Sequence, residues 1–466
     1  MLDRSRLTYL TPLALAAAVI AACSTSAKRS SFTQDEKTAD AGTEAGIGFT
    51  PGAVPCQGLA CKRAKCDEEG VTTTITGKVY DPAGANPLYN VMVYIPGGPN
   101  GDADLPPIAE GVSCETCASV AIDPMVSTLT NEKGEFELKD VPVDKDVPVV
   151  VQVGKWRRKL KFDVTKACEA NPVPDREFRL PKNSSEGDMP HIAVTAGMCD
   201  ALECLLRGIG VDDSEFVPGA STAGHIHVFN GDGGKFPGGP KAGGDAANPT
   251  GGELWNDVAK MAPYDMVMLS CECSESNDNK GGDPGTPGAR QSMWDYANMG
   301  GKIFATHFHY TWFKNSPQQD WQHVANWSSG SASDTTYEID QTFPKGAALA
   351  DWLFNVNASP TKGSIALVDV RASLSNVLPP SQSWIKKGDN AVRYFSFNAP
   401  TEAAPEDQCG RAVFSDLHLI SVGGNAFPNG CPAPGGLSAQ QKALEFMFFD
   451  LAGCVQSDNT PPEPPH

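Results

Sequence analysis

Closely spaced histidines are the residues of this sequence whose type and spacing could do chemistry. His225 and His227 lie two residues apart, and so do His307 and His309. Residues two apart in an extended segment face the same side, so each pair could present two imidazoles to one ion. Imidazole binds Zn²⁺ and similar ions, which activate water. These four histidines are the candidate ligands for a divalent metal, although we expect no cofactor, because His-x-His pairs also arise by chance.

Acid–base chemistry is the second option for the same part of the sequence. His418 adds a fifth imidazole, and Glu272 adds a carboxylate. Positioned imidazoles and carboxylates can exchange protons with a substrate without any metal. We therefore name His307, His309, His418 and Glu272 as the candidate catalytic residues of a hydrolase. The competing interpretation, which we favour, is that these side chains are structural and that the domain only binds or scaffolds.

The composition limits the classes of partner. The chain has 466 residues, of which 37 are Lys or Arg and 56 are Asp or Glu, for a net charge of −19. Binding of nucleic-acid phosphates needs a basic surface, so we expect no nucleic acid. The Gly-rich segment 231–252 lacks the Gly-Lys-Ser/Thr ending of a phosphate-binding loop. Since no heptad repeat is present, the sequence leaves the oligomeric state open.

The N-terminus has the features of an export signal. Two arginines precede the uncharged run 7–22, whose last residues are small and lead to Cys23. This pattern is typical of a secretory signal. The Ile-Ala-Ala-Cys sequence at 20–23 resembles the lipobox of bacterial lipoproteins; the alternative is an ordinary signal peptide. The resemblance implies cleavage before Cys23, lipidation of its thiol and anchoring by several acyl chains. Because Ser24 follows, it also implies the outer membrane.

Fourteen cysteines in an exported chain predict disulfide bonds. Thirteen remain when Cys23 is set aside, and an odd number leaves at least one thiol free, bonded outside the chain or bound to a ligand. Cys114 and Cys117 have the spacing of a redox or zinc pair. A second such pair at metal spacing is missing, so we expect structural disulfide bonding there. Cys271 could be a nucleophile, but we expect it to be bonded to another cysteine.

The segment 71–182 predicts an all-β sandwich. β-branched runs alternate with turns, and 126–138 has the pattern of a strand, a tight turn at Asn131–Gly134 and a strand. The order TGKVYD, VMVYI and TNEKGEFEL resembles the carboxypeptidase regulatory-like, transthyretin-like sandwich. In that family the module has no catalytic residues and supports, spaces or binds. The basic run 155–161 could touch an anion, but we expect its cations to pair with nearby carboxylates.

The segment 189–456 alternates strands and helices. We expect strands at 191–195, 225–229, 265–270, 302–306, 365–370, 392–397 and 411–415, with helices at 199–207, 253–261, 291–299, 347–354 and 440–451. This alternation predicts an α/β domain with a doubly wound, mostly parallel sheet. Chemistry in such sheets gathers at the carboxyl ends of the strands. Polar residues follow three of these ends, at 270–273, 306–309 and 415–418.

Two motifs of this segment carry a resemblance. MGGKIFATH at 299–307 resembles the strand before the nucleophile elbow of class I glutamine amidotransferase-like domains. CGRAVFSDLH at 409–418 resembles the terminal strand of the trehalose-utilisation branch of that superfold. The resemblance implies a reactive cysteine at the elbow, whereas this chain has His307 there. We therefore expect an amidotransferase-like domain that is degenerate as a glutaminase.

Together these features predict a cell-envelope lipoprotein with a signal peptide at 1–22, a cysteine-containing tether at 23–70, the two domains and a disordered tail at 457–466. We expect a membrane-anchored binding or scaffolding protein, attached through Cys23. Its ligand would be a carbohydrate or a peptide, with the aromatic residues near Tyr310 either stacking on it or packing in the core. The alternative is an envelope hydrolase or lyase that uses the His-rich strand ends.

Overall fold

The computed structural model describes residues 58–98, 101, 105–117, 123–232, 248–280, 288–419 and 427–464. The expected signal, Cys23, most of the expected tether and most of the Gly-rich segment 231–252 lie outside these ranges. The chain from Cys56 onward is one unit by its internal contacts. Within the described ranges, no helix has the length and apolar character needed to cross a bilayer.

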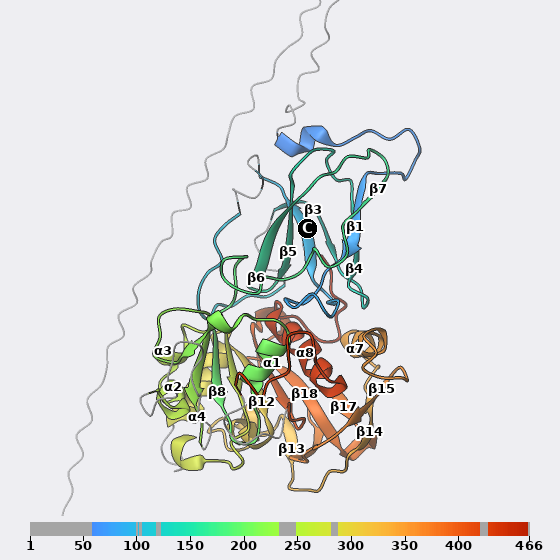
Figure 1. Ribbon diagram of the computed structural model, residues 1–466. Helices are drawn as coiled ribbons and strands as arrows, with labels where there is room; N and C mark the ends of the chain where they lie inside the picture. Colours follow the sequence, from blue (N-terminus) through green and yellow to red (C-terminus); the bar gives the residue numbers. More distant parts are fainter. Residues whose placement is uncertain are drawn as a thin grey trace, which may run out of the picture. The chain divides into compact units, whose positions relative to one another are not determined.

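Two small sheets follow the first described residues (Figure 1). One has the strand order β3-β2-β5-β6 and is antiparallel throughout. The other has the order β4-β1-β7, with β1 antiparallel to β4 and parallel to β7. No helix lies between β1 and β7 in the described residues. The strands are β1 (Thr74–Lys78), β2 (Met92–Pro96), β3 (Pro124–Leu129), β4 (Glu135–Lys139), β5 (Val147–Val153), β6 (Trp156–Phe162) and β7 (Ala170–Pro172).

Turn chemistry fixes the connection between β3 and β4. The side chain of Asn131 accepts hydrogen bonds from the backbone N–H groups of Lys133 and Glu135, each at 2.9 Å. Gly134 in the same turn has φ 69°, a conformation that glycine adopts without steric cost. The sequence predicted this strand, turn and strand, but β3 pairs with β2 and β4 pairs with β1, so the turn joins the two sheets and is not a hairpin. Buried residues of both small sheets belong to one hydrophobic cluster, so the sheets share a core.

A large mixed sheet of ten strands follows, in the order β15-β14-β17-β18-β19-β12-β11-β8-β10-β9. Its half from β9 to β19 is parallel, and its half from β19 to β15 is antiparallel. The strands are β8 (Ile192–Ala196), β9 (Phe216–Pro218), β10 (Ile226–Asn230), β11 (Met266–Leu269), β12 (Lys302–Thr306), β14 (Thr335–Ile339), β15 (Ser364–Leu367), β17 (Gln382–Lys386), β18 (Val392–Ala399) and β19 (Gly410–Ser415). A separate pair joins β13 (Ala325–Trp327) to β16 (Leu374–Val377).

Helices pack on both faces of the parallel half of the large sheet. Met266 and Met268 of β11 belong to a hydrophobic cluster with α1, α7 and α8, whereas Val267 and Leu269 belong to a second cluster with α2 to α6. This is the period-two alternation of a strand that is buried on both faces. The helices are α1 (Leu202–Gly208), α2 (Gly251–Trp255), α3 (Val258–Met261), α4 (Gly288–Asn298), α5 (Thr311–Lys314), α6 (Gln319–Gln322), α7 (Pro344–Asn355) and α8 (Ala439–Ala452).

The expectation of a mostly parallel sheet needs correction, because the large sheet is mixed. The strands β14 and β17 were not predicted, and they extend the sheet in an antiparallel direction beyond β18. Their sequences are short and interrupted by polar residues, so they carry little periodic signal of their own. They are strands because the edge of β18 offers β17 a ladder of hydrogen bonds, and β17 in turn offers one to β14.

Disulfide bonds confirm the prediction from the cysteine count. Five pairs are joined within the described residues: Cys66–Cys168, Cys114–Cys409, Cys117–Cys454, Cys199–Cys273 and Cys204–Cys431. Cys114 and Cys117 are therefore not bonded to each other, as a redox pair would be. They tie the segment 105–117 to the start of β19 and to the end of α8. The expectation that Cys271 is disulfide-bonded is wrong, because its thiol is free and buried.

Other expected surface features turn out to be buried. In the basic run 155–161, Lys155 pairs with Asp265 and Arg157 with Asp188, which confirms the expected pairing with carboxylates. Of the aromatic residues near Tyr310, the indole rings of the three tryptophans at 312, 321 and 352 are fully buried, so they pack in the core. The segment 457–464 is not a free tail throughout, because the buried carboxylate of Asp458 accepts a 2.7 Å bond from the guanidinium of buried Arg411.

Candidate metal centre

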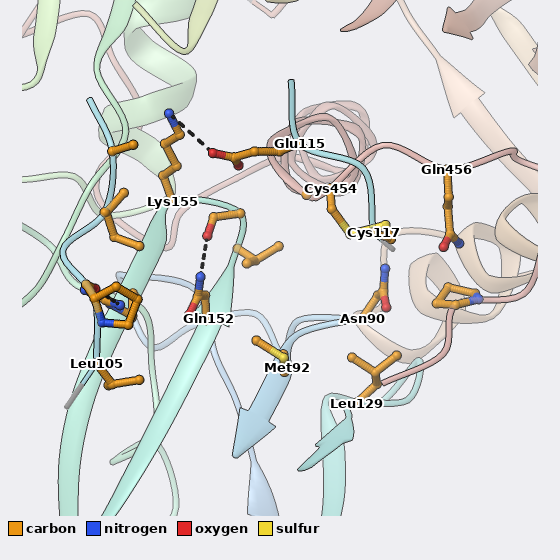
Figure 2. Close-up of a pocket in the computed structure, with 18 of the residues that line it drawn as sticks. Asn90, Met92, Leu105, Glu115, Cys117, Leu129, Gln152, Lys155, Cys454 and Gln456 are labelled. Carbon is orange, nitrogen blue, oxygen red and sulfur yellow. Dashed lines mark hydrogen bonds and ion pairs between the residues drawn. A yellow bond between two sulfur atoms is a disulfide. The ribbon is translucent and has the colours of Figure 1, made fainter. Parts of the chain in front are cut away.

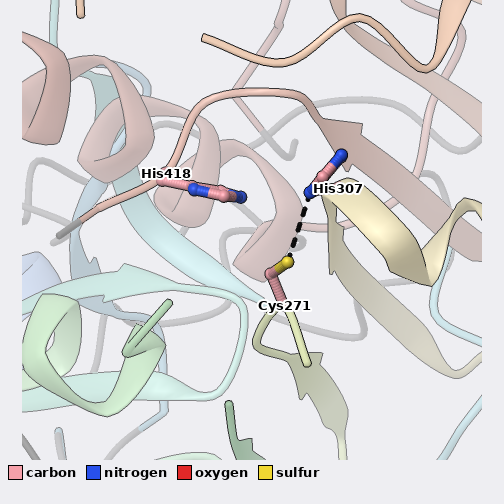
Figure 3. A group of neighbouring side chains, drawn as sticks. All are labelled: Cys271, His307 and His418. Atoms are coloured by element: carbon pink, nitrogen blue, oxygen red, sulfur yellow. Dashed lines mark hydrogen bonds between the residues drawn. The ribbon is translucent and has the colours of Figure 1, made fainter. Parts of the chain in front are cut away.

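Three potential metal ligands meet at the carboxyl ends of three neighbouring parallel strands. Cys271 lies two residues after β11, His307 directly follows β12, and His418 lies three residues after β19. These strands are adjacent in the large sheet, in the order β19-β12-β11. The thiol sulfur of Cys271 and one ring nitrogen from each histidine lie within 4.8 Å of one another (Figure 3). We call these three residues the Cys-His-His cluster.

The distances between the ligand atoms of the cluster are close to those between the ligand atoms of a bound zinc ion. The Cys271 Sγ atom lies 3.3 Å from His307 Nδ1. The rings of His307 and His418 are 5.2 Å apart between centroids and meet edge to face. In a tetrahedral zinc site, bond lengths of about 2.3 Å to sulfur and 2.0–2.1 Å to nitrogen place ligand atoms about 3.3–3.6 Å apart. The three atoms need shifts of only about an ångström to reach that geometry.

The backbone at the cluster is held in an unusual shape. His307 has φ 39°, in the left-handed region that non-glycine residues rarely adopt. Holding a non-glycine residue in this backbone conformation costs roughly 1–3 kcal/mol. Such strained residues are concentrated at functional sites. Next to it, Thr306 Oγ1 accepts a 3.0 Å hydrogen bond from Cys271 N and donates to Leu269 O at 3.2 Å, which fastens the end of β12 to the end of β11. Gly197 lies so close to Cys271 that a Cβ there would be 2.2 Å from the Cys271 carbonyl oxygen.

His418 is buried without the hydrogen bonds that a buried imidazole normally has. Its exposed fraction is 2%, and neither of its ring nitrogens has a hydrogen-bond partner in the described part of the chain. Its Nδ1 atom lies 3.6 Å from Asp369 Oδ2, beyond hydrogen-bond range. A histidine that binds a metal through one nitrogen commonly directs the other toward a carboxylate. Asp369 occupies that place beside His418.

The protonation states of the cluster favour the binding of a metal cation over the formation of a reactive thiolate. Burial raises the pKa of the Cys271 thiol to about 12, so the sulfur is protonated at neutral pH. Burial, followed by the neighbouring His418 and Arg371, lowers the pKa of His307 to about 3, so its imidazole is neutral. A thiolate–imidazolium pair therefore does not form on its own. Neutral imidazole is the form that binds a metal ion, and a bound ion displaces the thiol proton.

The carboxylate of Asp200 lies near the cluster, and one of its two oxygens has no hydrogen-bond partner among the described residues. It is fully buried, and Oδ1 accepts hydrogen bonds from Ala201 N at 2.9 Å and Leu419 N at 2.8 Å. Its Oδ2 atom has no hydrogen-bond partner within the described residues. Burial raises the pKa of Asp200, and the neighbouring His418 lowers it in part. A buried carboxylate without a cation is costly, and a divalent ion in the cluster would offset that cost.

Glu203, in the first turn of α1, makes stability depend on pH. It is buried, one of its oxygens has no hydrogen-bond partner among the described residues, and burial raises its pKa from 4.5 to about 8. The unfolded chain releases this proton near pH 4.5, so the contribution to stability is complete below that pH and is lost as the pH rises through about 8. We expect Glu203→Gln to remove roughly 3 kcal/mol of the fall in unfolding free energy between about pH 5 and pH 9. Urea unfolding at several pH values measures it. Glu169→Gln, at an exposed residue, is the control. If the unfolding free energy of Glu203→Gln falls with pH as steeply as that of the wild type, the expectation is contradicted.

Two of the candidate catalytic residues lie away from the cluster. His309 is buried, its Nε2 atom donates to Ser270 O at 2.9 Å, and its Nδ1 atom accepts from Trp312 Nε1 at 2.9 Å. Both nitrogens are thus occupied. Glu272 forms a buried ion pair with Lys280 and accepts from Asp232 N at 2.9 Å. His307 and His309 face different directions because residues 307–310 form a 3₁₀ turn rather than an extended segment.

The other histidine pair is at the opposite end of the parallel strands. His225 precedes β10 and contacts Glu215 Oε2 through Nδ1 at 2.7 Å. His227 lies near the start of β10, and its Nδ1 atom is 2.9 Å from the Tyr264 hydroxyl. The structure therefore does not bring His225 and His227 together with His307 and His309. The His-x-His spacing did not include Cys271 among the candidate ligands. Its position at the end of a predicted strand was the signal that could have indicated it.

The cluster adjoins an open pocket. His307 contributes to the wall of a cavity of about 430 Å³. The rest of the wall comes from the aromatic residues Phe308 and Tyr310, the serine-rich segment 328–332 and the segment 370–373. Cys271 and His418 are buried and do not line this pocket, so His307 is the member of the cluster that joins it to the pocket.

A second cavity, of about 280 Å³, lies on the small sheets (Figure 2). Its floor is apolar and includes Met92 and Leu129, and its rim includes the amides of Asn90, Gln152 and Gln456. The Gln152 amide is already bonded to the Gly154 carbonyl oxygen at 2.9 Å. Its wall also includes the ion pair between Lys155 and Glu115, at 3.7 Å, and the Cys117–Cys454 disulfide.

Comparisons with known proteins do not assign the chain to a family. No family model matches the chain, and no curated protein matches it. Among solved structures, a type II cohesin–X-dockerin complex from Acetivibrio cellulolyticus aligns at 13% identity over 32% of this chain and 78% of that one, with a TM-score of 0.16. A 9R-lipoxygenase from Cyanothece aligns at 15% identity over 25% of this chain and 19% of that one, with a TM-score of 0.12. Similarities this weak carry no argument about function.

Proposed function

We propose that this chain is an exported envelope protein that binds a divalent transition metal, with Zn²⁺ as the best fit, at the Cys-His-His cluster. The observation that carries the proposal is the convergence of one sulfur and two imidazole nitrogens within 4.8 Å at three adjacent strand ends. Thiolate and imidazole are the ligands that zinc prefers, and Cys and His sites are typical of it. The unbonded nitrogens of buried His418 support the same conclusion.

Metal analysis of the whole purified chain tests this proposal. We expect about one equivalent of zinc per chain when the protein is loaded with Zn²⁺ and dialysed, because one set of three ligands holds one ion. His323 is exposed and lies outside the cluster, so the variant His323→Ala serves as the control and retains the ion. Less than about a tenth of an equivalent in the wild type contradicts the proposal.

Anchoring to the envelope is the second part of the proposal. We infer that Cys23 is the lipidated residue of a lipoprotein signal and that the described residues comprise a carboxypeptidase regulatory-like sandwich (71–182) and an amidotransferase-like, doubly wound domain (189–456). The small sheets with their shared core, and the helices on both faces of the large sheet, support this assignment. The five disulfide bonds are consistent with an oxidising compartment.

The lipid anchor has its own test. We expect Cys23→Ala to move the protein from the membrane fraction to the soluble fraction of its native cells, because removal of the thiol removes the acyl chains that bind the bilayer. Fractionation followed by immunoblotting measures the change. Cys61→Ala, which keeps Cys23, is the matched control. If Cys23→Ala stays fully in the membrane fraction, the lipoprotein assignment fails.

Hydrolysis is a second candidate function, and one observation favours it. A catalytic zinc ion has three protein ligands and an open position for water, whereas a structural zinc ion has four. The cluster supplies three ligands beside an open pocket. The envelope hydrolase that the sequence left open would therefore use metal-bound water at this place rather than the four residues His307, His309, His418 and Glu272 acting together.

A further inference from the structure

The pocket beside the Cys-His-His cluster differs in charge from the chain as a whole. The chain carries a net charge of −19. Among the described residues that line this pocket, none is acidic, and one, Arg371, is a permanent cation. The remaining lining is aromatic, aliphatic or hydroxyl-bearing. The lining itself therefore carries no charge that repels an anion, although the chain as a whole is acidic.

Arg371 is fixed close to the cluster. Its backbone N–H donates to Asp416 O at 2.9 Å, and its guanidinium pairs with Asp369 at 2.8 Å. Asp369 is the same carboxylate that stands beside His418. The side chain of Arg371 is 39% exposed, so part of the guanidinium is available to a ligand.

Hydroxyl groups line the same pocket. The segment 328–331 has the sequence Ser-Ser-Gly-Ser and is fastened to the segment 370–373 by two backbone hydrogen bonds, Ser328 N to Ser373 O at 2.9 Å and Gly330 N to Ala372 O at 3.1 Å. Serine hydroxyls donate hydrogen bonds to oxyanions. The two segments therefore form one wall that carries both the cation and the hydroxyl donors.

We propose that this pocket binds a small oxyanion, a carboxylate or a phosphate, with one oxygen in the open position of the metal and the others facing Arg371. The proposal rests on the metal centre proposed above. Guanidinium groups pair with carboxylate and phosphate through two parallel hydrogen bonds, which makes arginine suited to this geometry. The volume of about 430 Å³ accommodates a small molecule rather than a polymer segment.

The whole chain loaded with Co²⁺ tests the two proposals separately. Cobalt occupies zinc sites, and a thiolate bound to it gives a charge-transfer absorption, whereas its visible bands respond to a fourth ligand. We expect the thiolate band on addition of Co²⁺ alone. We then expect acetate and inorganic phosphate, added in separate titrations, to change the visible bands saturably. The arm that saturates at the lower concentration identifies carboxylate or phosphate as the preferred group.

Variants of Arg371 assign the anion to the pocket. We expect Arg371→Gln to raise the dissociation constant of the preferred anion by at least about tenfold and Arg371→Lys to raise it less, with the thiolate band retained in both. Arg176→Gln, at an exposed arginine, is the matched control and leaves the constant unchanged. A retained thiolate band with no response to either anion, or with the same constant in Arg371→Gln, overturns the anion pocket and leaves the metal centre standing. Absence of the thiolate band in the wild type overturns the metal centre and the anion pocket together.

Discussion

Replacing Cys271 with serine is expected to lower the affinity for Zn²⁺ by about a hundredfold or more. Loss of a residue that only supports a ligand costs ten- to a hundredfold in metal affinity, and loss of a ligand costs at least as much. Serine has nearly the same shape as cysteine, but its hydroxyl does not ionise on the metal as a thiol does. Competition with a chromophoric chelator measures the dissociation constant of the wild type and of the variant.

A second ligand and a control make this result specific. His418→Ala is expected to lower the affinity by a similar factor, because His418 is the other buried member of the cluster. His323→Ala is expected to leave the affinity unchanged, since His323 is exposed and is not one of the three ligands. Far-UV circular dichroism of each variant shows whether the fold is kept. Folded Cys271→Ser with the affinity of the wild type would rule out Cys271 as a ligand.

Removing one of the disulfides between the segment 105–117 and the large sheet is expected to cost about 3–5 kcal/mol of unfolding free energy. Cys117–Cys454 joins residues 337 positions apart, but Cys114–Cys409 already closes nearly the same loop, so the additional loop is only about 50 residues long. Closing a loop of this length still restricts the unfolded chain, which is the main source of the stabilising effect. The double variant Cys117→Ala with Cys454→Ala removes it without leaving a free thiol. The midpoint of urea unfolding measures the change.

The comparison for this prediction is a disulfide whose loop no other bond shortens. Cys66–Cys168 spans 102 positions, so its double-alanine variant is expected to lose at least as much stability as the Cys117–Cys454 variant. Protease digestion distinguishes the two further, because only loss of Cys117–Cys454 releases the end of the segment 105–117. An unchanged urea midpoint for the Cys117–Cys454 variant would show that the link does not stabilise the fold.

Much of the fold could be predicted because local sequence and tertiary packing agree. The turn at Asn131–Gly134 has a side chain that bonds its own backbone and a glycine where φ is positive. The strand 302–306 was predicted with its observed bounds, since a buried parallel strand is a continuous apolar run between turns. The antiparallel strands β14 and β17 were not predicted, because the pairing of β17 with β18 and of β14 with β17 is decided by distant residues.

The candidate site was only partly predictable, and backbone conformation explains the difference. Cys271 was expected to be bonded to another cysteine. Cys273, two residues further on, has φ 66° and bonds to Cys199, whereas Cys271 keeps its thiol. His307 and His418 were named as candidates, and the rule that parallel strands end at one edge placed both there. The order β19-β12-β11 could not be read from the sequence.

X-ray absorption at the zinc edge of the loaded whole chain tests the central claim most directly. The Cys-His-His centre predicts one sulfur neighbour at about 2.3 Å and two imidazole nitrogens at about 2.0 Å, with any further neighbour a light atom. A spectrum with nitrogen and oxygen neighbours and no sulfur would contradict the assignment, because Cys271 would then not be bound to the ion.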